Sequence, residues 1–300
     1  MHCITPYSLL NVMMYCYDFE IAKLLIRVTS HYDLAEQFEL LPFRISYQTD
    51  RSPDALYAIK SLPPEWQVVG KKLSQEAHSA IYGWQDEVHR YFFWNIYSDD
   101  RYVLVTSKAN ATSEYTIYLQ ESTLQRILPQ FRLSAFLAPE QMLMEHRAFL
   151  LHSSVVDWSG TGILFTGPSG IGKSTQAQLW EQLEGAQIIN GDRAIIRCLD
   201  GTIQAWGSPF AGTSRIYKNQ GVPIHAIVVL AQGKVNTLQR LTGIAAFQRI
   251  LQEATTQPWD PQFMSALTDL ILNVTDHIPI YRLTCTPTAD AVDILKKELQ

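Results

Sequence analysis

The chain has 300 residues, of which 47% are hydrophobic and 18% are charged, and it carries a formal net charge of -5. This composition is typical of a folded globular protein with one large or two ordinary domains, and it lacks the excess of Lys and Arg that a general nucleic-acid binder needs. Because no apolar run is long enough to cross a membrane and the first residues lack a basic leader, we expect a cytoplasmic protein that binds neither nucleic acids nor membranes.

Residues 1–140 predict a β-rich α+β domain. The first twenty residues and the segment 18–30 are expected to contribute strands, and residues 121–131 are expected to be helical. A β-meander is predicted over residues 89–120, because the segments 89–97, 102–107 and 114–120 are separated by polar turns and the last alternates apolar and polar side chains. Nothing in this domain points to catalysis. Its role is left open, with binding of a partner or of an acceptor as one option.

Residues 141–300 predict a second domain, with the boundary near residue 140. A helix is expected over residues 140–148, where Pro139 marks its start. From Leu150 onward, short apolar strands alternate with helices, a pattern typical of an α/β layer. The predicted strands are 150–158, 162–166, 186–190, 193–198, 224–231 and 278–284, and the predicted helices are 173–183, 243–253, about 260–272, and 288–299.

The segment from Gly167 to Ser174 matches the Walker A pattern G-x-x-x-x-G-K-[ST] in full. A predicted strand before it and a predicted helix after it complete the context of a P-loop. Glycines let the backbone approach phosphate oxygens closely, and the start of the helix adds free N–H groups and a positive dipole end. Lys173 can neutralise the β- and γ-phosphates of ATP, and the hydroxyl of Ser174 can bind Mg²⁺. The residues expected to bind the nucleotide are Gly167, Ser169, Gly170, Ile171, Gly172, Lys173, Ser174 and Thr175.

Two further residues could join this loop in one site. Asp192 follows a predicted apolar strand, where its carboxylate could bind Mg²⁺ or accept a proton from an attacking hydroxyl. The alternative is a turn residue that closes the strand against Arg193. His152 lies within the predicted strand before the P-loop, and taken alone it could be a hydrogen-bonded core residue.

A third candidate lies in the irregular segment of residues 206–218, which is rich in glycine and hydroxyl side chains. Its Arg215 could contact the γ-phosphate, because the guanidinium fork matches phosphate geometry. The alternative is a surface loop with solvated cations. The sequence alone leaves both interpretations of this segment open.

The arrangement of a His-bearing strand, a P-loop and the sequence N-G-D-R at residues 190–193 resembles the C-terminal catalytic domain of HPr kinase/phosphorylase. That group includes kinase-like proteins found beside peptide-modification genes and, more remotely, ATP-dependent phosphoenolpyruvate carboxykinase. The resemblance covers about residues 145–299 and implies a P-loop catalytic domain with a mixed sheet. It also implies that His152, Lys173, Ser174 and Asp192 line one site, with Asp192 as metal ligand or catalytic base. Together with the P-loop pattern, the expected metal ligands are Ser174 and Asp192.

Two departures limit what the resemblance implies. HPr kinases carry two consecutive aspartates where this chain has Gly191 and Asp192, and the chain has no counterpart of their later L-E-x-R-G segment. The acceptor is therefore expected to be something other than HPr, and phosphorylase activity is in doubt. Relatives often form rings, so a homo-oligomer is an option.

These observations predict an ATP- and Mg²⁺-dependent kinase that transfers the γ-phosphoryl group to a hydroxyl. The expected acceptor is a Ser or Thr of a peptide or protein, or else a small molecule. The expected catalytic residues are Asp192, His152, Lys173 and Arg215. The alternatives are a nucleotide-binding switch or scaffold with little catalysis, and a carboxykinase-like enzyme that acts on a small molecule.

Overall fold

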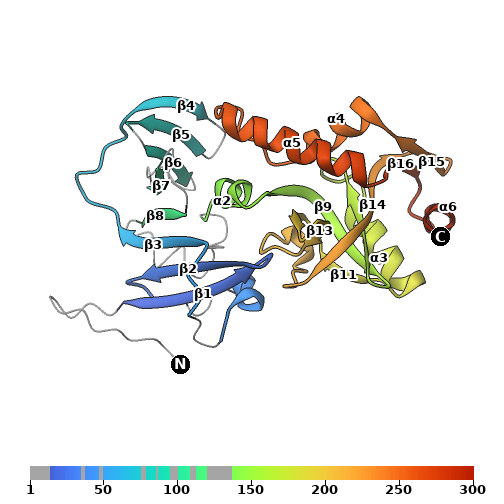
Figure 1. Ribbon diagram of the computed structural model, residues 1–300, viewed down its shortest axis with the longest axis horizontal. Coiled ribbons are helices and arrows are strands. Elements are labelled where there is room, and N and C mark those ends of the chain that lie inside the picture. Colours follow the sequence, from blue (N-terminus) through green and yellow to red (C-terminus); the bar gives the residue numbers. More distant parts are fainter. Residues whose placement is uncertain are drawn as a thin grey trace. The chain divides into compact units, whose positions relative to one another are not determined.

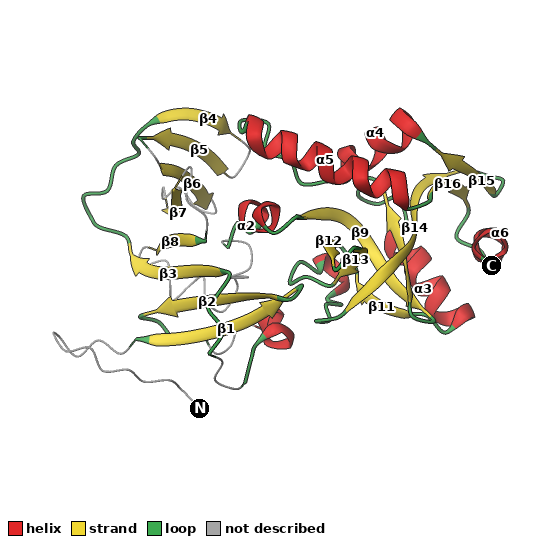
Figure 2. Cartoon of the chain, viewed as in Figure 1, coloured by secondary structure: helices red, strands yellow, loops and turns green. Residues whose placement is uncertain are grey.

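The chain folds as a mixed α/β protein with more strands than helices (Figures 1 and 2). The computed structural model describes residues 14–34, 38–46, 50–75, 79–85, 87–94, 101–108, 113–119 and 137–300. The strands expected in the first thirteen residues and the helix expected over 121–131 lie outside these ranges. The chain divides into two compact units, Met1–Met142 and Leu143–Gln300.

Unit 1 contains an eight-stranded sheet in the order β1-β2-β3-β8-β7-β6-β5-β4. Its elements are β1 (Tyr15–Ile21), β2 (Leu24–Ser30), the 3₁₀ helix η1 (Phe38–Phe43), β3 (Ala55–Ser61), β4 (Lys71–Gln75), β5 (Ser79–Trp84), β6 (Glu87–Trp94), β7 (Arg101–Lys108) and β8 (Glu114–Leu119). The predicted meander is confirmed by the antiparallel pairings of β6 with β7 and of β7 with β8. The strand region expected over residues 18–30 is a hairpin, which turns at Ala22 and Lys23 with positive φ angles of 51° and 66°.

Strand β3 makes this sheet mixed, because it pairs in parallel with both β2 and β8. The parallel pairs place Tyr57 and Tyr115 opposite each other, and their stacked rings are 4.6 Å apart between centroids. Stacked aromatic pairs of this kind add to the stability that burial of their area already gives.

Unit 2 follows the predicted alternation of strands and helices. Its elements are β9 (Ala148–Trp158), β10 (Thr161–Thr166), α3 (Lys173–Glu184), β11 (Gln187–Asn190), β12 (Arg193–Leu199), β13 (Thr202–Trp206), η3 (Gly212–Ser214), β14 (Gly221–Gln232), β15 (Thr237–Leu241), α4 (Gly243–Glu253), α5 (Pro261–His277), β16 (Ile280–Cys285) and α6 (Ala289–Leu299). The strands β13 and β15 were not predicted.

The helix expected over residues 140–148 was wrong in its last residues. Helix α2 (Glu140–Glu145) ends in a turn in which the N–H of His146 donates to the carbonyl of Leu143. Arg147 then adopts a positive φ of 55°, which no α-helix continues through. Ala148 therefore begins β9 and not another helical turn.

The sheet of unit 2 is mixed and aligns three strands in parallel. Strand β14 pairs in parallel with β10 on one side and with β16 on the other. The carboxyl ends of these three strands therefore meet at one edge of the sheet. The long strand β9 pairs antiparallel with β10, β11 and β12, so it links the parallel group to the antiparallel strands β12 and β13.

Helices cover both faces of this sheet (Figure 2). Successive residues of β10 point to opposite sides of the sheet. Leu164 packs in the cluster formed with α4 and α5, and Phe165 packs in the cluster formed with α3 and α6. Both residues are fully buried. This period-two division is what a strand covered on both faces requires. None of the helices in the described part of the chain combines the length and apolar character needed to cross a bilayer.

Candidate functional site

The loop that joins β10 to α3, here called the glycine loop (residues 167–172), has the backbone conformation that only glycine adopts readily. Its φ angles are 139° at Gly167, 78° at Gly170 and 115° at Gly172. A side chain added at Gly170 or Gly172 would meet nothing within 4 Å. The backbone conformation, and not crowding, therefore requires glycine at these two positions, and the space beside them is open.

Helix α3 begins directly at the end of this loop. Its first N–H groups have no acceptor within the helix, and Ser174 and Thr175 in its first turn are exposed. The apolar side chain of Ile171 packs against the core cluster beneath α3 and α6 and anchors the loop from below. The arrangement offers backbone donors and a helix N-terminus to an anion.

The Lys173 side chain is folded back under the glycine loop. It is only 7% exposed, and its Nζ donates to the carbonyl oxygens of Gly167 at 2.8 Å and Pro168 at 3.1 Å. Burial lowers the pKa of the Lys173 ammonium, while the nearby carboxylates of Glu253 and Asp192 act in the opposite direction. A buried cation thus lies within electrostatic range of two acidic groups.

The turn that carries Asp192 is held by the buried side chain of Asn190. The Oδ1 of Asn190 accepts hydrogen bonds from the backbone N–H groups of Asp192 at 3.0 Å and Arg193 at 2.9 Å. Its Nδ2 donates to the carbonyl of Ser208 at 3.0 Å. Asn190 therefore fixes both the turn and the loop that packs over it, a role typical of Asn in such turns.

Glycine at position 191 has a packing reason. A side chain there would collide with the hydroxyl of Ser214 in the overlying loop, whose Ile216 carbonyl accepts from the N–H of Gly191 at 3.2 Å. Gly212 in the same loop, with a φ of 55°, would bring a side chain within 2.9 Å of Cγ of Asp192. Position 191, where HPr kinases carry the first of two consecutive aspartates, therefore has no room for a side chain in this chain, because the loop packs closely over it.

His152 connects two carboxylates. It lies on β9 opposite Arg193, and its Nε2 is 3.3 Å from Oδ1 of Asp192. Its Nδ1 is 3.4 Å from Oε2 of Glu253, the last residue of α4. The hydrogen bond from His152 holds the pKa of Asp192 below its ordinary value, although partial burial opposes the effect.

The structure thus brings Lys173, Asp192 and His152 into one cluster and adds Glu253, which was not a candidate. Glu253 lies far along the chain from His152 in a helix without a motif, so no sequence signal marks it. Arg215 follows η3, is exposed and has a φ of 54°. Within the described residues, its guanidinium makes no hydrogen bond or ion pair with the other candidate residues.

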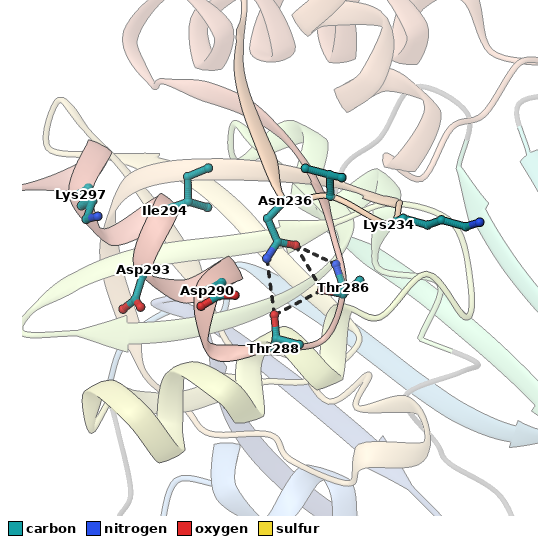
Figure 3. A pocket seen from close by; sticks show the side chains of 9 residues that line it. Lys234, Asn236, Thr286, Thr288, Asp290, Asp293, Ile294 and Lys297 are labelled. Carbon is teal, nitrogen blue, oxygen red and sulfur yellow. Dashed lines mark hydrogen bonds between the residues drawn. The ribbon is translucent and has the colours of Figure 1, made fainter.

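A cavity, here called the α6 cavity, opens at the sheet edge where β14 and β16 end, which is also the edge that carries the glycine loop. Figure 3 shows the side chains that line it. Its volume is about 590 Å³, and it is lined by the loops that follow β14 and β16 and by one side of α6. Oδ1 of Asn236 accepts from the N–H of Thr286 at 2.9 Å, and its Nδ2 donates to the hydroxyl of Thr288 at 3.4 Å. The lining also includes apolar side chains, carboxylates and ammonium groups: Val235 and Ile294, Asp290 and Asp293, and Lys234 and Lys297.

The described residues contain no group of three His, Cys, Asp or Glu side chains that could by itself hold a metal ion. Mg²⁺ differs from most protein-bound metals in that it keeps several waters and commonly takes one or two protein ligands together with substrate phosphates. The exposed Ser174 hydroxyl and the Asp192 carboxylate are oxygen ligands of the kind it prefers. The residues present therefore fit Mg²⁺ bound together with a nucleotide.

Comparisons with known proteins find similar chains among solved structures alone. No protein-family model matches the chain, and no curated protein matches it. Among solved structures, the chain is similar to the HPr(Ser) kinase/phosphatase from Coxiella burnetii, with 15% sequence identity and a TM-score of 0.31 over 50% of this chain and 87% of that one.

Proposed function

We propose that this chain is an ATP- and Mg²⁺-dependent phosphotransferase that transfers the γ-phosphoryl group to a hydroxyl, with a Ser or Thr of a peptide or protein as the acceptor. The observation that carries the proposal is the cluster of a buried lysine at a glycine loop and an ionised aspartate supported by a histidine. The lysine and the glycine loop can bind a polyphosphate, and the ionised aspartate can accept the proton of an attacking hydroxyl.

Binding of the triphosphate is assigned to the glycine loop and the first turn of α3. The backbone N–H groups and the positive helix end attract phosphate oxygens, and the ammonium of Lys173 can exchange its two carbonyl acceptors for them. Because burial disfavours the charged form of Lys173, a bound polyanion would restore the stabilisation that the ammonium lacks.

The nucleoside part of ATP is assigned to the α6 cavity. Strand β14 lies between β10 and β16. The glycine loop after β10 and the loop after β16 are therefore about two strand spacings apart, roughly 10 Å. The lining carries the carboxylates of Asp290 and Asp293 beside the ammonium groups of Lys234 and Lys297, so its formal charges balance. The carboxylates can accept hydrogen bonds from ribose hydroxyls or base amino groups. Val235 and Ile294 supply the apolar contact that a base needs.

The transfer step is assigned to Asp192. The acceptor hydroxyl gives its proton to the Asp192 carboxylate while its oxygen forms a bond to the γ-phosphorus. The bond from that phosphorus to the bridging oxygen breaks, and ADP leaves. Mg²⁺, held by Ser174 directly and by Asp192 through a water molecule, would neutralise charge on the phosphates. His152 holds one oxygen of Asp192, which leaves the other free to face the acceptor.

The test is transfer of label from γ-labelled ATP to a panel of Ser- and Thr-containing peptides, with the full chain and Mg²⁺. We expect transfer by the wild-type chain and a loss of about 100- to 10,000-fold in Asp192→Asn, which keeps the size of the side chain but not its basicity. The exposed Asp269 on α5 provides a matched control, and Asp269→Asn should be as active as the wild type.

The other outcomes separate the alternatives. Tight retention of nucleotide without transfer to any acceptor would refute the kinase and favour a nucleotide-dependent switch. Formation of phosphoenolpyruvate from oxaloacetate would instead favour a carboxykinase-like enzyme. Full transfer by Asp192→Asn would remove Asp192 from the chemical step.

A further inference from the structure

Glu253 is placed beside His152 by backbone contacts that follow it directly. The N–H of Thr255 donates to the carbonyl of Leu150 at 3.0 Å, and Ala254 forms an isolated antiparallel bridge with Leu151. The end of α4 is therefore attached to β9 immediately before His152. This attachment fixes where the Glu253 side chain starts, whatever its rotamer.

The rest of α4 keeps that position rigid. Ala246 and Ile250 are buried in the core cluster that includes residues of α5, and Ile250 is one helical turn before Ala254. The N–H of Ala254 also donates to the carbonyl of Ile250, which closes the last turn at 3.0 Å. The Glu253 side chain itself is only 13% exposed, so its carboxylate cannot move far from the imidazole.

We infer that Glu253 is a positioning residue of the candidate site, and that it holds the His152 ring so that Nε2 faces Asp192. This inference rests on the proposed phosphotransfer function. An imidazole fixed at only one nitrogen can turn its ring and lose the other contact. A carboxylate that accepts from Nδ1–H removes this freedom and selects the ring orientation, as carboxylate partners of histidines do in many sites.

The orientation matters because it divides the two oxygens of Asp192. Oδ1 is 3.3 Å from Nε2 of His152, whereas Oδ2 has the Arg193 Nε at 4.0 Å, beyond hydrogen-bond distance. Asp192 therefore keeps one oxygen in a fixed contact and turns the other toward the acceptor. If His152 rotated away, the carboxylate could rotate as well, and both would lose their alignment for proton transfer.

Glu253 has an opposite effect on nucleotide binding. Its carboxylate is separated from that of Asp192 only by the imidazole of His152, so its negative charge belongs to the cluster that faces the phosphates. Like charges repel, so its removal should leave ATP affinity unchanged or raise it. A loss of turnover without a loss of ATP affinity is thus the signature of positioning, because local unfolding would reduce both.

The experiment compares Glu253→Ala, Glu253→Gln and Glu181→Ala in the full chain, where Glu181 is an exposed glutamate on α3. We expect Glu253→Ala to lower kcat by about 10- to 100-fold with equal or tighter ATP binding. Glu253→Gln, which keeps an acceptor oxygen, should recover most of that loss. Adding His152→Ala to Glu253→Ala should cause no loss beyond that of His152→Ala alone. Unchanged kcat in Glu253→Ala, a fully additive double variant, or weaker ATP binding would overturn the inference.

A second measurement decides the inference even if the chain transfers no phosphate. In selectively labelled protein, the Nδ1–H proton of His152 should give a resolved, slowly exchanging NMR signal that disappears in Glu253→Ala and persists in Glu181→Ala. A signal that is absent from the wild type, or unchanged in Glu253→Ala, would refute positioning. Failure of transfer alone would refute only the kinase assignment.

Discussion

The ammonium group of Lys173 has two acceptors within its own loop, so the side chain is bound to the loop backbone. The carbonyls of Gly167 and Pro168 hold it, and burial makes its charge unfavourable. We therefore expect Lys173 to contribute more to ligand binding than to the stability of the fold. Its removal deletes two hydrogen bonds at a solvent-facing loop but leaves the core of α3 intact.

We expect Lys173→Ala to lower phosphate transfer by at least about 100- to 1,000-fold, because the transferred group loses its nearest cation. The far-UV circular dichroism spectrum should remain that of the wild type. Transfer kinetics with the labelled-ATP assay provide the measurement, and the exposed Lys60 on β3 supplies the control Lys60→Ala. Wild-type kinetics in Lys173→Ala would contradict the role of the glycine loop.

Gly212 tests how tightly Asp192 is held. Alanine there would carry a strained φ of 55° and would press on Asp192, whereas Gly201, with a φ of 76°, has nothing within 4 Å of an added Cβ. Both changes should destabilise the fold by about 1 kcal/mol through strain. Only Gly212→Ala should also lower kcat, because only it displaces the carboxylate. Urea unfolding and transfer kinetics measure the two effects. Equal kcat in the two variants would argue against a closely held Asp192.

The candidate site could be predicted only where its residues are close in the sequence. The glycine loop and Lys173 follow from one local pattern, and Asn190 could have been found, since N-G-D is a recognised turn signal. Glu253 could not, because it reaches His152 through the packing of α4 against β9. The need for glycine at position 191 could not be predicted either, because any side chain there would collide with Ser214, which lies in a loop distant in the sequence.

At the scale of elements, the same division between local and long-range information holds. The hairpin β12–β13 turns at Asp200 and Gly201, both with positive φ, and D-G is a strong hairpin signal that the prediction missed. Strand β4 has no such signal, because most of its residues are exposed and its pattern does not alternate. Only pairing with β5 makes it a strand.

In unit 1, Tyr17 attaches the chain after β2 to strand β1. Its hydroxyl donates to Oδ1 of Asp33 at 2.7 Å and accepts from the N–H of Leu34 at 2.9 Å. Burial raises the pKa of Tyr17 to about 12 from 10.0, and the Asp33 contact adds to the shift. The neutral phenol is thus the form that the folded state favours.

We expect Tyr17→Phe to lower the free energy of unfolding by about 1–3 kcal/mol, since one hydrogen bond is lost and a buried N–H loses its acceptor. Because the folded-state pKa is raised, the contribution of Tyr17 is fully present below pH 10 and is lost as pH rises toward about 12. The difference in urea stability between the wild type and Tyr17→Phe should therefore shrink over that range. Tyr15→Phe, which changes the ring stacked on Tyr17, is the control. A difference that does not vary with pH would contradict the assignment.

At the scale of the whole molecule, the candidate site and the α6 cavity share one structural cause. The three parallel strands β10, β14 and β16 end at one sheet edge, where the loop after β10 is the glycine loop and the loops after β14 and β16 line the α6 cavity. Ligands in open α/β sheets commonly bind at such an edge. The overall charge of -5 does not attract a polyanion, so binding of ATP must depend on the local donors of the glycine loop and on Lys173.

The most direct test of this account is a calorimetric titration of ATP with Mg²⁺ into the purified full chain, beside the same titration of Lys173→Ala. The account predicts one saturable binding event per chain for the wild type, a rise in its melting temperature that increases with ATP concentration, and strongly weakened binding for the variant. A titration without binding heat and without a change in melting temperature would contradict it.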